Sequence, residues 1–201
     1  MPKFTDNEKE HIKQNLLTKG RNIFIKYGLA KTSIDEIIKE CGIAKGTFYK
    51  FFDSKEELYY EILINEVEVR EGVLNELFRK NLTSKELLHS FFHFSFDSVE
   101  KNPFLQQFFQ NEDHERLIRK LPDQMSEFNQ MNAMRGIQAV NLLIEQGTLP
   151  TNDPRVIVGI MQAVLTLRLH KNEIGDDIFP IVKDKIIEFV VEGLLKEKNY
   201  M

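Results

Sequence analysis

Helix-start signatures recur along this chain, and each is followed by apolar residues at helical spacing. In a capping box, a Ser or Thr precedes a Glu by three positions, and the two side chains bond the free N–H groups at a helix start. We predict helix starts at pairs with this spacing, namely Ser33–Glu36, Ser54–Glu57 and Thr83–Glu86. We find no strand-like alternation, repeat or low-complexity segment. The sequence therefore predicts an all-α fold of about nine helices.

Glycine and proline mark the ends of most expected helices. The first covers residues 11–27 and stops at Gly28, and a short helix from Ile34 stops at Cys41-Gly42. A second short helix follows at about 44–51, and two short helices across a glycine-containing turn form a helix-turn-helix pattern. Further helices are expected at 54–80, 83–101, from Pro103, at 123–146 up to Gly147, at 154–171 after the cap Asp153, and at 178–197 after Asp176 or Asp177.

Composition excludes several protein classes. The 201 residues suffice for one mid-sized or two small domains. A single cysteine, Cys41, rules out an internal disulfide framework and a cysteine-rich zinc site. No apolar run is long enough to cross a bilayer, and the charged start lacks the apolar core of a signal peptide. We therefore expect a soluble, cytoplasmic protein without a membrane partner.

Charge is distributed unevenly along the chain. Residues 1–55 hold 11 Lys or Arg against 7 Asp or Glu, a net charge of +4, although the whole chain carries −4. Residues 56–201 therefore carry −8. This asymmetry indicates a polyanion-binding N-terminal segment on a body with a different task.

The segment 32–58 contains, at a specific spacing, Gly42, Gly46, Thr47, Tyr49, Phe52, Lys55 and Leu58. These residues occupy signature positions of the TetR-type helix-turn-helix, which the segment therefore resembles. The motif covers about 45–50 residues, with Ile23, Phe24 and Gly28 fitting the family's first helix. The resemblance implies a transcriptional regulator, usually a repressor, that forms a homodimer of all-α subunits. It implies a DNA-binding domain at 1–53, with its recognition helix at about 44–51, and a ligand-binding and dimerising domain at 54–201.

The resemblance assigns DNA contacts that also make physical sense. Gly46 lets the backbone approach DNA, and Lys45 and Thr47 can reach base edges or phosphates in the major groove. Tyr49 and Lys55 occupy positions of phosphate contacts, and the helix start at Lys55 also favours a phosphate. The complete set of predicted DNA-binding residues is Thr32, Ser33, Lys45, Gly46, Thr47, Tyr49, Lys50, Phe51 and Lys55.

Four positions depart from the family pattern. Ala44 replaces a Ser that often caps the recognition helix, at a cost of about 1 kcal/mol. Phe51 replaces a His or Tyr and removes a polar contact. Gly20 and Cys41 each replace an Ala, and Cys41 is expected to pack in the core rather than to sense oxidants.

Phenylalanine is concentrated between residues 78 and 128, which suggests a pocket for an apolar or amphipathic molecule. The predicted lining is Phe91, Phe92, Phe96, Phe104, Phe108, Phe128, Met125 and Met131. Alternatively, these side chains simply fill the core. A cationic ligand held by aromatic faces and by Asp97, Glu100 and Glu112 is a further possibility. His89 and His93 share a helix face without a third ligand, so we expect no metal and no cofactor.

The aliphatic last two helices are expected to form the dimer interface. The predicted residues are Val156, Ile160, Val164, Leu167, Ile186, Phe189 and Val190. Two-fold symmetry would then match a roughly palindromic double-stranded DNA operator. A ligand would shift the helix that starts at Ser54 and release the operator. A regulator without a small-molecule effector, controlled by a protein partner or purely architectural, is an alternative, as is an activator. No residue constellation suggests an enzyme.

Overall fold

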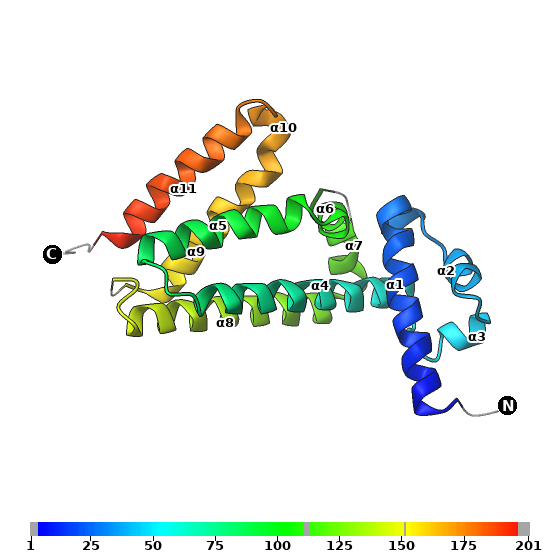
Figure 1. Cartoon of the computed structure of the whole chain (residues 1–201). Coiled ribbons are helices and arrows are strands. Elements are labelled where there is room, and N and C mark those ends of the chain that lie inside the picture. Colours follow the sequence, from blue (N-terminus) through cyan, green and yellow to red (C-terminus); the bar gives the residue numbers. More distant parts are fainter. Residues whose placement is uncertain (1–3, 111–112, 151, 197–201) are drawn as a thin grey trace. The chain divides into compact units, whose positions relative to one another are not determined.

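The computed structural model describes residues 4–110, 113–150 and 152–196, and the regular secondary structure within them is helical (Figure 1). The all-α prediction is therefore confirmed. The helices are α1 (Asp6–Lys31), α2 (Ile34–Cys41), α3 (Lys45–Phe48), α4 (Lys55–Phe78), α5 (Ser84–Glu100), α6 (Pro103–Gln110), α7 (Asp113–Lys120), α8 (Pro122–Glu145), α9 (Pro154–Thr166), the 3₁₀ turn η1 (Leu167–His170), α10 (Lys171–Ile174) and α11 (Phe179–Leu195).

Side-chain caps explain where several helices begin. Complete capping boxes open α2 at Ser33 and α5 at Thr83, as predicted. Ser54 accepts the N–H of Glu57 at 3.1 Å, but the Glu57 carboxylate accepts the N–H of Asp53 instead of that of Ser54. An additional box, Thr5 with Glu8, starts α1 five residues earlier than the apolar spacing predicts.

Several predicted boundaries are wrong at the C-terminal side of the chain. The short helix predicted from Pro103 is present as α6, but the next helix, α7, was not predicted, and α9 passes into η1 and α10 instead of continuing to residue 171. The last helix begins after Ile178 without a side-chain cap, so neither Asp176 nor Asp177 caps it. Pro180 in its first turn has no N–H that would need a cap partner.

The chain divides into two compact units. The first contains Met1–Arg70 and Asn102–Met125, and the second contains Glu71–Lys101 and Ser126–Met201. In the first unit α1 packs against α2, α6 and α7. Its aromatic core centres on Tyr59, whose ring lies 5.0 Å from that of Phe24 and 4.6 Å from that of Phe104. Burial of these aromatic rings stabilises the first unit.

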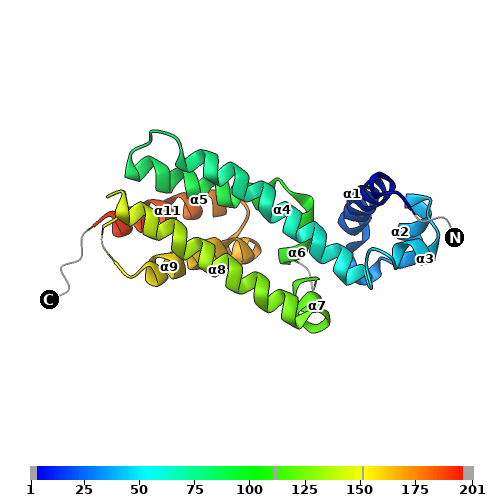
Figure 2. The same ribbon diagram turned by 90° about the horizontal axis from the view of Figure 1, so that it is seen from below.

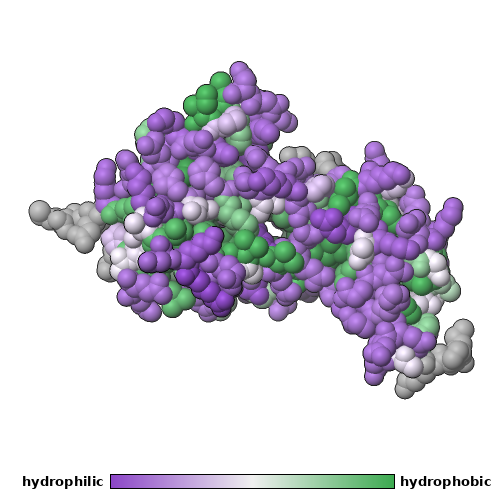
Figure 3. Space-filling model, in the orientation of Figure 1, coloured by the Kyte–Doolittle hydropathy of each residue, from purple (hydrophilic) through white to green (hydrophobic). Residues whose placement is uncertain are grey.

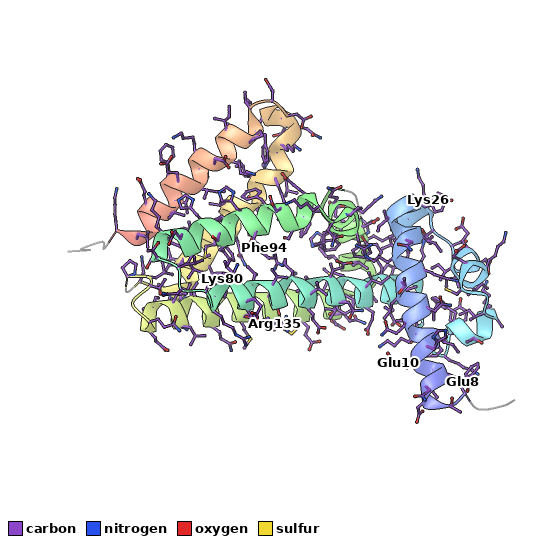
Figure 4. All side chains as sticks on the ribbon, viewed as in Figure 1. Glu8, Glu10, Lys26, Lys80, Phe94 and Arg135 are labelled. Atoms are coloured by element: carbon purple, nitrogen blue, oxygen red, sulfur yellow. The ribbon has the colours of Figure 1, made fainter. Side chains whose placement is uncertain are left out.

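The second unit is built around α5, which lies beside α11 and also contacts α9 (Figures 1 and 2). The fully buried side chains of Phe92, Phe96 and Ile187 contribute to one apolar cluster from these helices. On α8, Arg135 donates to the Glu71 carboxylate at 2.8 Å, and Figure 4 labels this arginine.

Polar side chains cover most of the face seen in Figure 3. Apolar atoms reach the surface over the start of α11, where Ile178 and Ile181 are 47% and 63% exposed. Among the described residues, none of the helices combines the length and the apolar character that crossing a bilayer requires.

Candidate nucleic-acid interface

Helix α2 is fixed at both ends by local bonds. Its start has the reciprocal Ser33–Glu36 box, and its end has Gly42 in the left-handed conformation at φ 68°. The Gly42 N–H donates to the Lys39 carbonyl at 3.3 Å, and the Ile43 N–H donates to the Ile38 carbonyl at 3.1 Å. These bonds satisfy the free carbonyls of the helix end and define the turn that leads into α3.

Helix α3 is held by its buried face rather than by a cap. The Phe48 side chain is fully buried, with its ring 5.5 Å from that of Tyr49 and 6.0 Å from that of Phe52. Ala44 makes no side-chain cap bond, as the departure from the family pattern predicts. The α-helix covers only Lys45–Phe48, shorter than the predicted 44–51, and residues 49–51 continue as turns.

The first turn of α3 presents open backbone to the outside. Lys45 and Gly46 are exposed, and Thr47 is half-buried. A Cβ built on Gly46 would meet no atom within 4 Å, and Gly46 does not have a positive φ. The fold itself therefore does not require glycine here, which fits a position kept small for the approach of another molecule.

Basic and aromatic side chains surround this exposed turn. The Lys45 ammonium lies 2.9 Å from the Asp35 carboxylate, which raises the pKa of the Lys45 side chain by hydrogen bonding and by charge. The Lys50 ammonium lies 4.9 Å from the centre of the Phe4 ring, and Tyr49 is 46% exposed. This surface can offer cations and a hydroxyl to phosphates, and Thr47 to a base edge.

Three other predicted contact residues are engaged within the protein. Thr32 is only 2% exposed, and its hydroxyl donates to the Gly28 carbonyl at 2.8 Å. The Ser33 hydroxyl donates to the Glu36 carboxylate at 2.8 Å, and the Phe51 side chain is half-buried. The structure therefore does not group Thr32 with the exposed residues of α3.

Lys55 has its three ammonium donors occupied by backbone carbonyls. It donates to Leu29 at 2.7 Å, to Ala30 at 3.2 Å and to Thr32 at 2.5 Å. Burial lowers the pKa of the Lys55 ammonium, and the charge of Arg116 lowers it further. A phosphate contact by Lys55 remains a prediction, and it would replace at least one of these bonds.

Sequence reasoning missed two neighbours of the exposed turn. Asp35 forms the ion pair with Lys45, and Phe4 supplies the ring beneath Lys50. Asp35 stands in the first turn of α2, where an acidic residue is ordinary, so its position alone gave no sign of a partner. Phe4 precedes the Thr5 cap, and recognising that box would have placed it near the start of α1.

The predicted pocket residues are divided between the two units. Phe104, Phe108 and Met125 are buried in the first unit. The second unit contains the fully buried Phe92 and Phe96, the largely buried Phe128, and the half-buried Phe91 and Met131. The structure therefore does not bring the whole set together within one unit.

The predicted interface residues of α9 and α11 include exposed apolar side chains. Val156 is 51% exposed, Ile160 38% and Phe189 66%, whereas Val164 is buried. Leu167, Ile186 and Val190 are half-buried and pack against the core cluster of the second unit. A contiguous patch of such side chains would mark an interaction surface, and these residues come from two helices that contact each other.

The remaining candidates show ordinary structural roles. Cys41 is buried, and burial raises the pKa of its thiol, so it is a poor nucleophile. The His89 and His93 rings stack at 6.3 Å, and no group of three metal-ligating side chains occurs among the described residues. Asp97 pairs with Lys101 at 2.6 Å, and Glu112 lies outside the described residues.

Comparison with known proteins shows that the segment containing α2 and α3 is similar to a known family. Residues 16–62 match the family described as bacterial regulatory proteins, tetR family. The uncharacterised regulator YerO of Bacillus subtilis is 48% identical over 52 residues, which are 26% of this chain and 17% of that protein. The repressor KstR2 of Rhodococcus jostii is 26% identical over 114 residues, 57% of this chain and 56% of that protein.

A solved structure extends the likeness to the whole fold. The regulator FadR of Bacillus subtilis, in complex with stearoyl-CoA, has a TM-score of 0.65 at 18% identity, covering 90% of this chain and 98% of that one. The matched segments span between about a sixth and just over half of the length of the two curated relatives. The matched family and both relatives are transcriptional regulators rather than enzymes. The matched segment contains α2 and α3, so these two helices lie in the part of the chain that is similar to the tetR family of bacterial regulatory proteins.

Proposed function

We propose that this regulator is a homodimeric repressor that binds a roughly palindromic operator and leaves it when a small apolar or amphipathic molecule binds. The observation that supports DNA binding is the first turn of α3, where Lys45 and Gly46 are exposed and Thr47 is half-buried. The buried Phe48 side chain anchors this helix. We assign residues 1–53 to DNA binding and residues 54–201 to ligand binding and dimerisation. Binding to the chromosome would place the protein in the cytoplasm.

Dimerisation through α9 and α11 is supported by their exposed apolar side chains. Val156, Ile160 and Phe189 lie on helices that pack against each other in the second unit. A second copy would bury these side chains at about 25 cal/mol per Å² of apolar surface. Sedimentation should then give a dimer, and Phe189→Glu should shift the equilibrium toward monomer.

The proposed effector is supported by the character of the second unit and by relatives. Phe91 is half-buried on α5, and the Ser95 hydroxyl on the same helix is buried without a hydrogen-bond partner among the described residues. FadR was solved with stearoyl-CoA, an amphipathic molecule, and KstR2 is named a repressor. A coupling free energy of about 1–3 kcal/mol between effector and operator would suffice for a useful switch.

The second candidate is a regulator without a small-molecule effector. Phe92 and Phe96 favour it, because both are fully buried in a packed core rather than lining a space. A thermal-shift screen of fatty acids, acyl-CoA esters and sterols separates the two, since a ligand that binds only the folded state raises Tm. An activator role is separated from repression by reporter transcription with and without the protein.

Selection of DNA from a random pool tests the proposal as a whole. Enrichment of an inverted repeat, with affinity that falls steeply as salt rises, supports a dimer that reads two half-sites. Absence of any enriched sequence would contradict operator recognition by this chain alone.

A further inference from the structure

The break in α1 at Gly28 is the feature from which this inference starts. Gly28 has φ 75° and ψ 162°, far from helical values, although the helix resumes for a few residues up to Lys31. In an uninterrupted α-helix the Leu29 N–H would donate to the Ile25 carbonyl, four residues earlier. The Gly28 backbone turns that N–H away and leaves both groups in need of other partners.

Side chains from two distant helices supply these partners. The Leu29 N–H donates to the Asp113 carboxylate of α7 at 3.2 Å, and the Ile25 carbonyl accepts from the Gln107 amide of α6 at 3.0 Å. Leu29 is fully buried and Asp113 is only 3% exposed. A single backbone bond of α1 is therefore replaced by one bond to α6 and one to α7.

The same turn is held from α4. The Leu29 carbonyl accepts from the Lys55 ammonium, so the N–H and the carbonyl of this one residue are bonded to α7 and α4, respectively. Next to these bonds, Arg116 of α7 donates to the Glu56 carboxylate of α4 at 2.8 Å, and Glu56 is 7% exposed. The ordered turn 28–33 leads directly into the Ser33 cap of α2, the first helix of the DNA-binding motif.

The buried Asp113 carboxylate would destabilise the fold if it had no hydrogen-bond partner. Burial raises the pKa of Asp113, while the Leu29 N–H, the Tyr59 hydroxyl and the charges of Arg116 and Lys55 lower it. Removing the carboxylate would leave the Leu29 N–H buried without a hydrogen-bond acceptor, which would destabilise the turn at Leu29.

We propose that Asp113 and Gln107 are positioning residues through which α6 and α7 hold the break in α1 and thereby set the turn that carries α2 and α3. The expected effect on DNA affinity rests on the proposed function, whereas the effect on the turn itself does not. It adds a route into the DNA-binding motif that is separate from α4. A displacement of α7 would release the turn at Leu29 and weaken DNA binding even with Lys55 in place.

The test compares Asp113→Ala, which removes the acceptor, with Asp113→Asn, which keeps an acceptor oxygen and removes the charge. Amide hydrogen exchange at Leu29, and affinity for the operator selected from a random pool, are measured on the full chain. We expect exchange at Leu29 to rise and affinity to fall by about tenfold in Asp113→Ala. Asp113→Asn should retain most of the exchange protection at Leu29 and most of the operator affinity. Gln107→Leu should lose part of each.

Glu115→Ala is the matched control, because Glu115 lies on the exposed side of α7 and pairs only loosely with Arg119 at 3.7 Å. It should leave exchange and affinity unchanged. The proposal would be overturned if Leu29 exchanged in Asp113→Ala at the same rate as in the parent. It would also be overturned if exchange became faster throughout the first unit rather than at residues 28–33. Failure of the parent to select any operator would count against the proposed function alone, because the exchange result still decides whether α7 holds the turn.

Discussion

The two helices of the DNA-binding motif are stabilised in opposite ways. Helix α2 has a reciprocal capping box, eight residues and a left-handed glycine at its end, so its polar groups are satisfied locally. Helix α3 has four residues, no side-chain cap and a first turn open to the outside, and it depends on the burial of Phe48. The contrast shows that α3 leaves its first turn open to the outside and obtains its stability from one buried side chain rather than from a cap.

Removing that anchor should have the largest effect. Phe48→Ala deletes a fully buried ring and should cost about 3–5 kcal/mol in the free energy of unfolding. Urea denaturation measures this loss. Tyr49→Ala is the neighbouring control, because its side chain is 46% exposed and should cost about 1 kcal/mol or less. Equal losses in the two variants would show that α3 is not anchored by Phe48.

The next effect concerns the lysine that joins α4 to the turn before α2. Lys55→Met retains the apolar stem and removes three hydrogen bonds to carbonyls, which should cost about 1–3 kcal/mol of stability. The salt dependence of DNA binding should change little. If instead stability is kept and the slope of log affinity against log salt falls by about 0.9, Lys55 leaves the carbonyls for a phosphate, as the family resemblance implies.

Removing the cap of α2 and adding one to α3 tests how much the caps contribute to the stability of the two helices. Ser33→Ala removes the box of α2 and should destabilise the protein by about 1 kcal/mol, whereas Ala44→Ser offers α3 a cap and should stabilise it by about 0.5–1 kcal/mol. Thermal unfolding of both variants and of the double variant gives the values. A neutral Ser33→Ala would mean that the box contributes nothing in the folded protein.

The smallest effect is expected at the exposed ion pair between the two helices. Asp35→Asn frees Lys45 from a carboxylate 2.9 Å away, so DNA affinity should rise by less than tenfold and its salt slope should steepen by up to about 0.9. Asp6→Asn, which breaks the exposed pair with Lys9, is the control. A drop in affinity would show instead that Asp35 holds Lys45 in its binding position.

Local signals in the sequence predicted the parts of the fold that local bonds determine. The boxes at Ser33 and Thr83, the turn at Gly42 and the missing cap at Ala44 all depend on residues within a few positions of one another. Gly28 was predicted to end the first helix, and its positive φ does break α1 there.

The hydrogen bonds around the break at Gly28 could not be predicted from local sequence signals. Leu29 and Asp113 are separated by 84 positions, and Ile25 and Gln107 by 82. An Asp at a helix start and a Gln within a helix are ordinary residues, and only packing of α6 and α7 on α1 gives them these partners. Similarly, the residues predicted to line a pocket are divided between the two compact units, and this division depends on packing rather than on local sequence.

We propose that the exposed turn of α3 reads the operator, and DNA selection with a Thr47 variant tests this directly. Parent and Thr47→Ala are each used to select DNA from the same random pool, and the preferred bases are compared position by position. We expect an inverted repeat for both proteins, with the preferred base of Thr47→Ala changed at matching positions of the two half-sites. Identical preferences in the two selections would contradict the assignment of Thr47 and its turn as the reading surface.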